Sequence, residues 1–141
     1  FVFYTNYESE KGKAIAKNTN VCLSFFWHQA ERQVIIKGKA EKIAENMSDG
    51  YFESRPRGSQ LGAIVSHQSE VLKNRDVLED RLKKFEEIYD GKDIPRPDFW
   101  GGFIVKPVEI EFWQGRANRL HDRIRYKLDE EFNWQIDRLT P

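Results

Sequence analysis

The side chains best suited to chemistry lie near the C-terminal end of the chain. Between Arg116 and Lys127 there are five basic residues and one acidic residue, although the formal net charge of the chain is zero. If residues 119–126 are extended, alternate side chains share one face. That face would carry Arg119, His121, Arg123 and Arg125. Guanidinium groups bind and stack on flat anions, and an imidazole can hold a phenolic oxygen, so this pattern indicates a planar, phosphorylated ligand.

The other face of this expected strand would carry Leu120, Ile124 and Tyr126, which suit a core. A solvated strand face is the common alternative for any isolated basic strand. Trp113 borders the basic run and is therefore the tryptophan to consider as a ligand contact. The tryptophans at 27, 100 and 134 are expected to be core anchors.

A second candidate cluster lies in the middle of the sequence. Tyr51 precedes Arg55 by one helical turn, and a Pro-Arg-Gly stretch separates Arg55 from Ser59. A phenol, a guanidinium and a hydroxyl can form a phosphate cradle. The alternative is a helix-capping serine beside solvated arginines. Further on, Gln68 and Ser69 suit the ribityl or phosphate part of a nucleotide cofactor, with ordinary surface polarity as the alternative.

Composition excludes several classes of protein. The 23 basic and 23 acidic residues argue against bulk electrostatic capture of nucleic acid or of an anionic membrane. No apolar segment is long enough to span a bilayer. The single cysteine, Cys22, rules out an internal disulfide. None of the three histidines has an acidic or cysteine companion at ligand spacing, so no metal site is expected.

The pattern of apolar residues predicts a mainly β protein with peripheral helices. Strands are expected at 1–5, 21–27 (buried on both faces), 32–43, 102–106, 108–113, 120–127 and 132–139, and helices at 10–17, 48–54, 58–65 and 76–89. Short turns between most strands favour a small antiparallel barrel with helices outside it. We expect one domain over residues 1–141. Because the chain starts abruptly with strand-like residues, we also expect natural N-terminal strands to be missing.

Several motifs then resemble one family from the first residue to the last. These motifs are FYTN (3–6), ERQV (31–34), YFESRP (51–56), SHQS (66–69), FWGG (99–102), EFWQG (111–115), RLHDR (119–123) and DRLTP (137–141). The chain is identified on these as a member of the pyridoxamine (pyridoxine) 5′-phosphate oxidase family. EFWQG followed by RLHDR is the most specific of these signals.

The resemblance implies an antiparallel, Greek-key-like FMN-binding split barrel and a homodimer with FMN at the subunit interface. It also implies a reaction of vitamin B6 salvage, in which pyridoxamine or pyridoxine 5′-phosphate is oxidised by O2. Electrons would pass from the substrate C4′ carbon to flavin N5 and on to oxygen, giving pyridoxal 5′-phosphate and hydrogen peroxide. A cytoplasmic location is the corresponding expectation. The alternative is a non-catalytic module that binds flavin or pyridoxal phosphate.

The same resemblance assigns roles to individual residues. Those implied to contact FMN are Tyr4, Thr5, Lys11, Gln33, Gln68, Ser69, Trp113 and Arg123. Those implied to bind the substrate are Tyr51, Arg55 and Ser59 at its phosphate, Arg119 against the pyridine ring and His121 at its 3-oxygen. Arg119 and His121 are the implied catalytic pair, acting by orientation and electrostatics.

Overall fold

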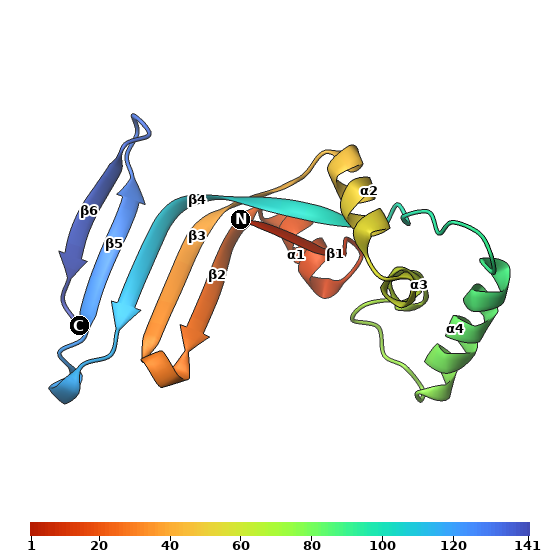
Figure 1. Ribbon diagram of the computed structural model, residues 1–141. Coiled ribbons are helices and arrows are strands. Elements are labelled where there is room, and N and C mark those ends of the chain that lie inside the picture. Colours follow the sequence, from red (N-terminus) through yellow and green to blue (C-terminus); the bar gives the residue numbers. More distant parts are fainter. The chain divides into compact units, whose positions relative to one another are not determined.

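The computed structural model describes residues 1–141, and three consecutive helices separate its first three strands from the last three (Figure 1). In chain order these are β1 (Val2–Asn6), α1 (Glu10–Lys17), β2 (Asn20–Trp27), β3 (Arg32–Lys42), α2 (Glu45–Ser54), α3 (Arg57–Val65), α4 (Asp76–Ile88), β4 (Trp100–Gln114), β5 (Asp122–Leu128) and β6 (Trp134–Leu139). Two 3-10 turns, His28–Ala30 and Ala117–Arg119, interrupt the connections. No helix combines the length and apolarity needed to cross a membrane.

The strands form one antiparallel sheet in the order β2-β3-β4-β5-β6, with β1 paired to β4. The predicted class, mainly antiparallel β structure with helices, is therefore confirmed. The chain divides into two compact units, which are described separately. Unit 1 contains residues 1–18 and 41–104, and unit 2 contains residues 19–40 and 105–141. The expectation of a single domain stays a prediction.

Unit 1 holds the helices and an aromatic core. Phe52, Leu61, Ile94 and Trp100 are buried together at its centre. Apolar residues of α4, including Leu82 and Phe85, are packed against this cluster, as the helical spacing of the sequence predicts. The core therefore fixes α2 and α3, which carry the second candidate cluster.

Helix α1 begins as predicted at Glu10 because Ser9 caps it. The buried Ser9 hydroxyl accepts from the Gly12 backbone N–H at 3.2 Å and donates to the Asn6 carbonyl at 2.7 Å. Gly12 is needed here because a Cβ would lie 2.1 Å from the Tyr7 carbonyl oxygen. This tight junction between β1 and α1 brings Lys11 back towards Thr5.

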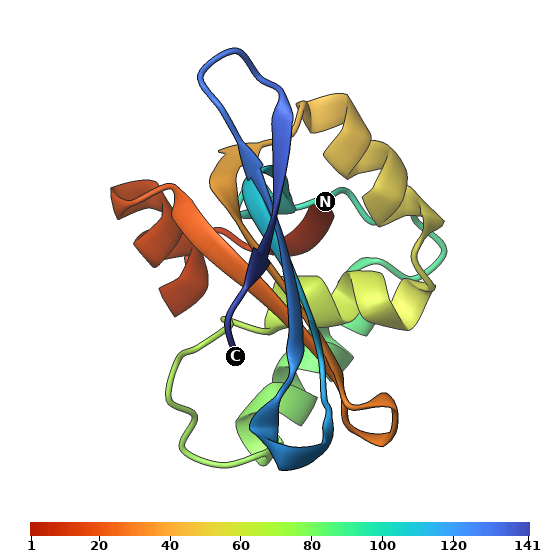
Figure 2. The same cartoon turned by 90° about the vertical axis from the view of Figure 1, so that its left-hand side faces the viewer.

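Unit 2 contains strands and no α-helix. Its β5–β6 hairpin, the two blue strands of Figure 2, places most polar and most apolar side chains on opposite faces by alternation, with Arg138 on the apolar side as an exception. One face carries Arg123, Arg125 and Asp137. The other carries apolar residues of three neighbouring strands in register: Ile110, Phe112, Ile124, Tyr126, Trp134 and Ile136. We call this second set the apolar sheet face.

Two predicted strand properties are wrong. The break between 102–106 and 108–113 is absent, because β4 continues through Pro107 to Gln114. Gly38 of β3 allows close approach at this point, since a Cβ there would lie 2.3 Å from the Lys106 carbonyl oxygen. In addition, β2 is not buried on both faces: Phe26 is 58% exposed and Trp27 is 49% exposed. Its apolar run faces solvent because no helix of unit 2 covers it.

Helix α2 also begins earlier than expected, at Glu45 with Ala44 as its cap residue. Ser48, where the helix was expected to begin, lies inside α2; it is buried, and its hydroxyl accepts from the Gly102 backbone N–H at 3.2 Å. β6 begins at Trp134 rather than at 132, since Phe132 has a φ of 63° and lies in the hairpin turn. These shifts leave Tyr51 and Arg55 at the predicted end of α2.

Candidate functional site

The first group of candidate residues in unit 1 surrounds Thr5. The Lys11 ammonium donates to the Thr5 hydroxyl at 3.2 Å, and this hydroxyl donates to the Gln68 side-chain oxygen at 3.1 Å. The Asn6 backbone N–H donates to the same Gln68 oxygen at 3.2 Å. The structure thus brings Gln68 to Thr5 and Lys11, although Gln68 lies 63 positions from Thr5 in the sequence. We call Thr5, Lys11 and Gln68 the Thr5 cluster.

The Thr5 cluster has donors left over. Lys11 pairs with no carboxylate, and its single hydrogen bond leaves the other ammonium protons available. The amide nitrogen of Gln68 has no hydrogen-bond partner, because both contacts of this side chain use its oxygen. Ser69 follows with an exposed side chain and a φ of 75°. A cation and a neutral amide with free N–H groups fit an anionic oxygen ligand such as a phosphate.

Trp100 connects the residues of the second group. Its indole stacks with Tyr4 at a ring-centroid distance of 5.6 Å and with Tyr51 at 6.2 Å. Tyr4 and Tyr51 are themselves stacked at 3.8 Å. Tyr4 is half-buried by these contacts, whereas Tyr51 is 44% exposed and keeps its phenol accessible.

Arg55 lies over the same indole, with its guanidinium carbon 4.7 Å from the Trp100 ring centroid. Its Nη1 atom is buried and has no hydrogen-bond partner. Unpaired buried donors are uncommon in folded proteins, and they mark sites where a missing acceptor belongs. Ser59 lies in the first turn of α3, two residues beyond the helix start at Arg57. The free backbone N–H groups at the N-terminus of a helix favour binding of an anion. The N-terminus of α3 follows Arg55 by two residues in the sequence.

The third group lies in unit 2, in the loop between β4 and β5. The Arg116 backbone N–H donates to Nδ1 of His121 at 3.1 Å, and the Trp113 and His121 rings lie 4.8 Å apart. The start of the loop is fixed by the Gly115 backbone N–H, which donates to the Glu31 carbonyl at 2.7 Å. His121 is therefore half-buried and held from two sides.

The expected strand over 119–126 is wrong at its beginning. β5 starts at Asp122, and Arg119 closes a 3-10 turn in which Asn118 and Arg119 have φ values of 57° and 62°. Arg119 and His121 therefore do not share a strand face with Arg123, although Arg123 and Arg125 do share one. Leu120 is 70% exposed, so it does not belong to the core. The loop deviates because Asn118 and Arg119 both take the left-handed conformation, which asparagine favours but arginine rarely adopts.

A hollow of about 400 Å³ in unit 2 is lined by Gln33 of β3 and Trp113 of β4, among other residues. Gln33 is half-buried and its side-chain amide makes no hydrogen bond within the protein. Arg32, its neighbour, instead donates to the Gln114 side-chain oxygen at 2.7 Å. Gln33 and Trp113 thus line a hollow that also includes Phe112 and Ile124 of the apolar sheet face.

Arg123 is bound to a carboxylate within unit 2. Its Nε and Nη2 donate to the two oxygens of Glu111 at 2.7 and 3.0 Å, and Nη1 donates to the Thr140 carbonyl at 3.0 Å. The Arg123 hydrogen bond lowers the pKa of the Glu111 carboxyl below its ordinary value of 4.5, although partial burial acts in the opposite direction. The same pairing raises the pKa of Arg123. The proposed contact with FMN must therefore use the remaining N–H groups of Arg123.

We predict that Glu111→Gln destabilises the protein by about 1–2 kcal/mol at neutral pH, because it removes a two-point charged pair. Since the folded pKa of Glu111 is lowered, its stabilisation is complete above the ordinary value of 4.5 and is lost as the pH falls through the folded value. Urea unfolding from neutral pH to about pH 3 measures this. The difference in free energy of unfolding between the wild-type protein and Glu111→Gln should become smaller as the pH falls. Glu130→Gln, which changes an exposed glutamate, is the control. A difference independent of pH would contradict the assignment.

Three residues shape these groups in ways that the sequence did not predict. Trp100 is a core residue, as expected, but it also supports Tyr51 and Arg55. Asp122 accepts hydrogen bonds from the side chains of Arg116 at 2.8 Å and Arg138 at 2.7 Å, which lower its pKa. Its place between His121 and Arg123 in the RLHDR motif was the available signal. The contact between the Arg116 backbone N–H and His121 could not be predicted from any motif in the sequence.

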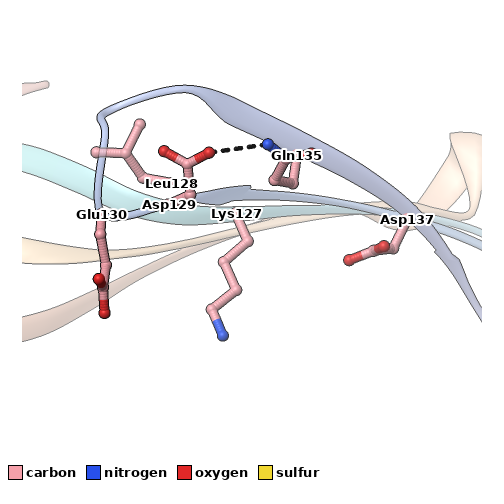
Figure 3. A pocket seen from close by; sticks show the side chains of 6 residues that line it. All are labelled: Lys127, Leu128, Asp129, Glu130, Gln135 and Asp137. Carbon is pink, nitrogen blue, oxygen red and sulfur yellow. Dashed lines mark hydrogen bonds between the residues drawn. The ribbon is translucent and has the colours of Figure 1, made fainter.

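A further hollow on the β5–β6 hairpin is lined by Asp129, Glu130 and Asp137 together with Lys127, Leu128 and Gln135 (Figure 3). Asp129 accepts from the Gln135 amide at 2.8 Å and from the backbone N–H groups of Glu131 and Asn133 at 2.9 and 2.8 Å. The Asn133 backbone hydrogen bond is the main cause of the lowered pKa of Asp129. This carboxylate therefore holds the turn. No group of three or more His, Cys, Asp or Glu side chains is placed to hold a metal ion.

Solved structures give the class of the protein. PhzG from Burkholderia lata, crystallised with tetrahydrophenazine-1-carboxylic acid, matches with a TM-score of 0.90 at 28% identity, over 99% of this chain and 68% of that one. A pyridoxamine 5′-phosphate oxidase-related, FMN binding protein from Nostoc punctiforme matches with a TM-score of 0.75 at 13% identity, over 99% of this chain and 72% of that one. The fold is thus that of the split-barrel proteins related to pyridoxamine 5′-phosphate oxidase.

The family follows from sequence. Residues 1–89 match the pyridoxamine 5′-phosphate oxidase family, and residues 100–141 match the pyridoxine 5′-phosphate oxidase C-terminal dimerisation region. The chain belongs to the pyridoxamine 5′-phosphate oxidase family, as the motifs predicted. The pyridoxine/pyridoxamine 5′-phosphate oxidases of Flavobacterium psychrophilum and Flavobacterium johnsoniae are 69% and 66% identical over 100% and 99% of this chain. The chain spans 66% and 65% of their lengths, about two thirds.

Proposed function

We propose that the protein oxidises pyridoxamine or pyridoxine 5′-phosphate with bound FMN and O2, giving pyridoxal 5′-phosphate and hydrogen peroxide. Family membership supports the reaction class. The single observation that carries the substrate assignment is Arg55, whose buried Nη1 lacks an acceptor while its guanidinium lies on Trp100. An anionic phosphate would supply that acceptor, and the exposed Tyr51 phenol and the start of α3 would complete the cradle.

FMN fits the residues that remain. Lys11, Gln68 and Ser69 would hold its phosphate and ribityl oxygens, because the Thr5 cluster has unused N–H donors. Gln33 and Trp113 would meet its ring system from the hollow that they line. When bound, FMN supplies the two-electron acceptor that O2 regenerates. The residues of the protein would bind and orient FMN and the substrate and would supply the charged groups of the site.

His121 and Arg119 would position the substrate in this proposal. With Nδ1 occupied by the Arg116 N–H, the neutral imidazole carries its proton on Nε2 and can donate it to the substrate 3-oxygen. Arg119 is exposed at the end of the 3-10 turn, two residues before His121, and would lie against the pyridine ring. Holding the ring in this way would direct the C4′ carbon–hydrogen bond towards the flavin.

The test is an anaerobic absorption spectrum of the purified protein with FMN, before and after pyridoxamine 5′-phosphate. Flavin bands that bleach with substrate and return with air are the expected result. Bound flavin that stays oxidised would instead indicate a non-catalytic flavin-binding module. Tetrahydrophenazine-1-carboxylic acid is the comparison substrate, because PhzG was crystallised with it. Bleaching by this compound and not by pyridoxamine 5′-phosphate would move the protein to a different substrate class.

We further propose a homodimer with FMN at the subunit interface, and a cytoplasmic location. The dimerisation-region match over residues 100–141 supports the dimer, and so does the apolar sheet face, where Phe112 and Ile136 are 45% and 62% exposed. Large exposed apolar patches of this kind mark interaction surfaces. The location rests on the family expectation and on the single cysteine, and cell fractionation tests it.

Ile136→Glu is predicted to break the dimer, because it places a charge on the apolar sheet face, on its edge strand β6. Light scattering should give a dimer mass for the wild-type protein and a monomer mass for the variant, and FMN should be lost with the partner. Gln135→Glu, on the opposite face of the same strand, is the matched control and should remain dimeric. An Ile136→Glu protein that stays dimeric would exclude this face as the interface.

A further inference from the structure

Asp122 joins the two ends of the region that holds His121. Its Oδ2 accepts from Arg116 Nε at 2.8 Å at the start of the loop, and its Oδ1 accepts from Arg138 Nη1 at 2.7 Å on β6. Both carboxylate oxygens are therefore used in one bridge between the loop and the hairpin. The three side chains are 61%, 38% and 67% exposed for Arg116, Asp122 and Arg138. Ion pairs this exposed contribute little to global stability, so the bridge needs another explanation.

The loop itself requires an anchor. Asn118 and Arg119 both have positive φ values, a conformation that non-glycine residues adopt only when surrounding contacts impose it. Arg116 lies just before this turn and His121 just after it. The Arg116 N–H donates to His121 Nδ1 across the turn at 3.1 Å. The Asp122 carboxylate therefore fixes, through the Arg116 side chain, the residue whose backbone contacts the imidazole.

This contact determines where the imidazole proton lies. A backbone N–H can only donate, so Nδ1 must accept, and the neutral ring must carry its proton on Nε2. Trp113, with its ring 4.8 Å from that of His121, restrains the ring on the other side. Released from Arg116, the imidazole would be free to rotate and to exchange tautomers, and it would present a donor at Nε2 only part of the time.

We propose that Asp122 is a positioning residue for the oxidation: through Arg116 it holds His121 in the tautomer that presents Nε2–H to an anionic oxygen of the substrate. This inference rests on the proposed function, in which that oxygen is the substrate 3-oxygen. Arg138 is the fixed point of the bridge because it lies in β6, paired opposite Ile124 of β5. The negative charge of Asp122 is essential, since it must hold two guanidinium groups at once.

Asp122→Asn tests the proposal, because the amide keeps the volume but has only one accepting oxygen for two arginines. Long-range 1H–15N NMR spectra of the imidazoles report the tautomer, and His121→Ala identifies the signal among the three histidines. In the wild-type protein, His121 should show an unprotonated Nδ1 and a protonated Nε2. In Asp122→Asn the two nitrogen shifts should move towards an average. The flavin reduction rate should fall on the order of tenfold, with a smaller change in KM.

Asp137→Asn is the matched control. Asp137 also pairs with an arginine of the hairpin, Arg125 at 2.7 Å, but it does not contact the loop. Its replacement should change neither the tautomer nor the rate. If Asp122→Asn does not fold, Arg116→Ala provides the second variant, because it keeps the backbone N–H and removes the guanidinium that Asp122 holds. Arg116→Lys should restore part of the lost rate.

The readouts separate this proposal from the proposed function. An unchanged His121 tautomer in both Asp122→Asn and Arg116→Ala would overturn the positioning role, and so would an equal effect of Asp137→Asn. If the wild-type protein does not oxidise pyridoxamine 5′-phosphate, the proposed function fails while the NMR comparison still decides the role of Asp122 in fixing the imidazole. A shifted tautomer with an unchanged reduction rate would remove Asp122 from the reaction.

Discussion

Replacing His121 by alanine is expected to slow flavin reduction by pyridoxamine 5′-phosphate about 100-fold. The reason is that the Nε2–H group is the donor that the loop presents, and no other side chain takes its place beside Trp113. FMN affinity should be almost unchanged, because the Thr5 cluster and Gln33 remain intact. Stopped-flow absorbance under anaerobic conditions gives the reduction rate, and fluorescence titration gives the FMN dissociation constant.

His28→Ala is the control for this experiment. His28 is also in unit 2, but it is exposed on a different turn, where its ring meets the edge of Phe26 at 6.1 Å. The control should reduce flavin at the wild-type rate. A His121→Ala protein with a normal rate would remove His121 from the site. A protein that lost FMN instead would show that His121 supports the cofactor rather than the substrate.

Local signals in the sequence predicted most elements of the fold. The helix expected at 10–17 is α1, and the apolar spacing of Val77 to Tyr89 marked α4. Alternation predicted the buried face of β3, where Ile36, Gly38 and Ala40 are buried in turn. These predictions succeeded because periodicity depends on residues only a few positions apart.

The errors arose where contacts distant in sequence determine the backbone. Pro107 ordinarily interrupts a strand, yet β4 continues because Gly38 of β3 leaves room for the Lys106 carbonyl. The aromatic run of β2 predicted burial, but burial depends on which element covers it, and none in unit 2 does. Such information is absent from the local pattern.

The site follows the same rule. The residue types of the RLHDR motif were visible, but their arrangement as alternate side chains of a strand was wrong, because Arg119 belongs to a left-handed turn. The Thr5–Gln68 hydrogen bond joins residues 63 positions apart and has no local signal. For both, the family resemblance supplied the candidates, and the structure supplied the contacts that explain their positions.

Arg55→Met is the second variant with a large expected effect, and it should raise the KM for pyridoxamine 5′-phosphate. Methionine can still pack on Trp100 and Phe52, so the aromatic core that Arg55 covers is kept while the charge is removed. A charge-assisted hydrogen bond contributes about 1.5–3 kcal/mol, which corresponds to roughly a 10- to 100-fold rise in KM. Steady-state oxygen consumption at varied substrate concentration measures this change.

The variant also has a chemical signature that distinguishes lost phosphate recognition from general damage. The wild-type protein should favour phosphorylated substrate over pyridoxamine itself, and Arg55→Met should lose most of that preference, because only the phosphorylated substrate needs the guanidinium. Arg75→Met, which removes an exposed arginine paired with Glu79, is the control and should keep the preference. If Arg55→Met discriminates as well as the wild-type protein, the unpaired Nη1 has a different partner, and the phosphate must bind elsewhere. The free N–H groups of Lys11 and Gln68 would then be the next candidates for binding the phosphate, because no carboxylate pairs with the Lys11 ammonium.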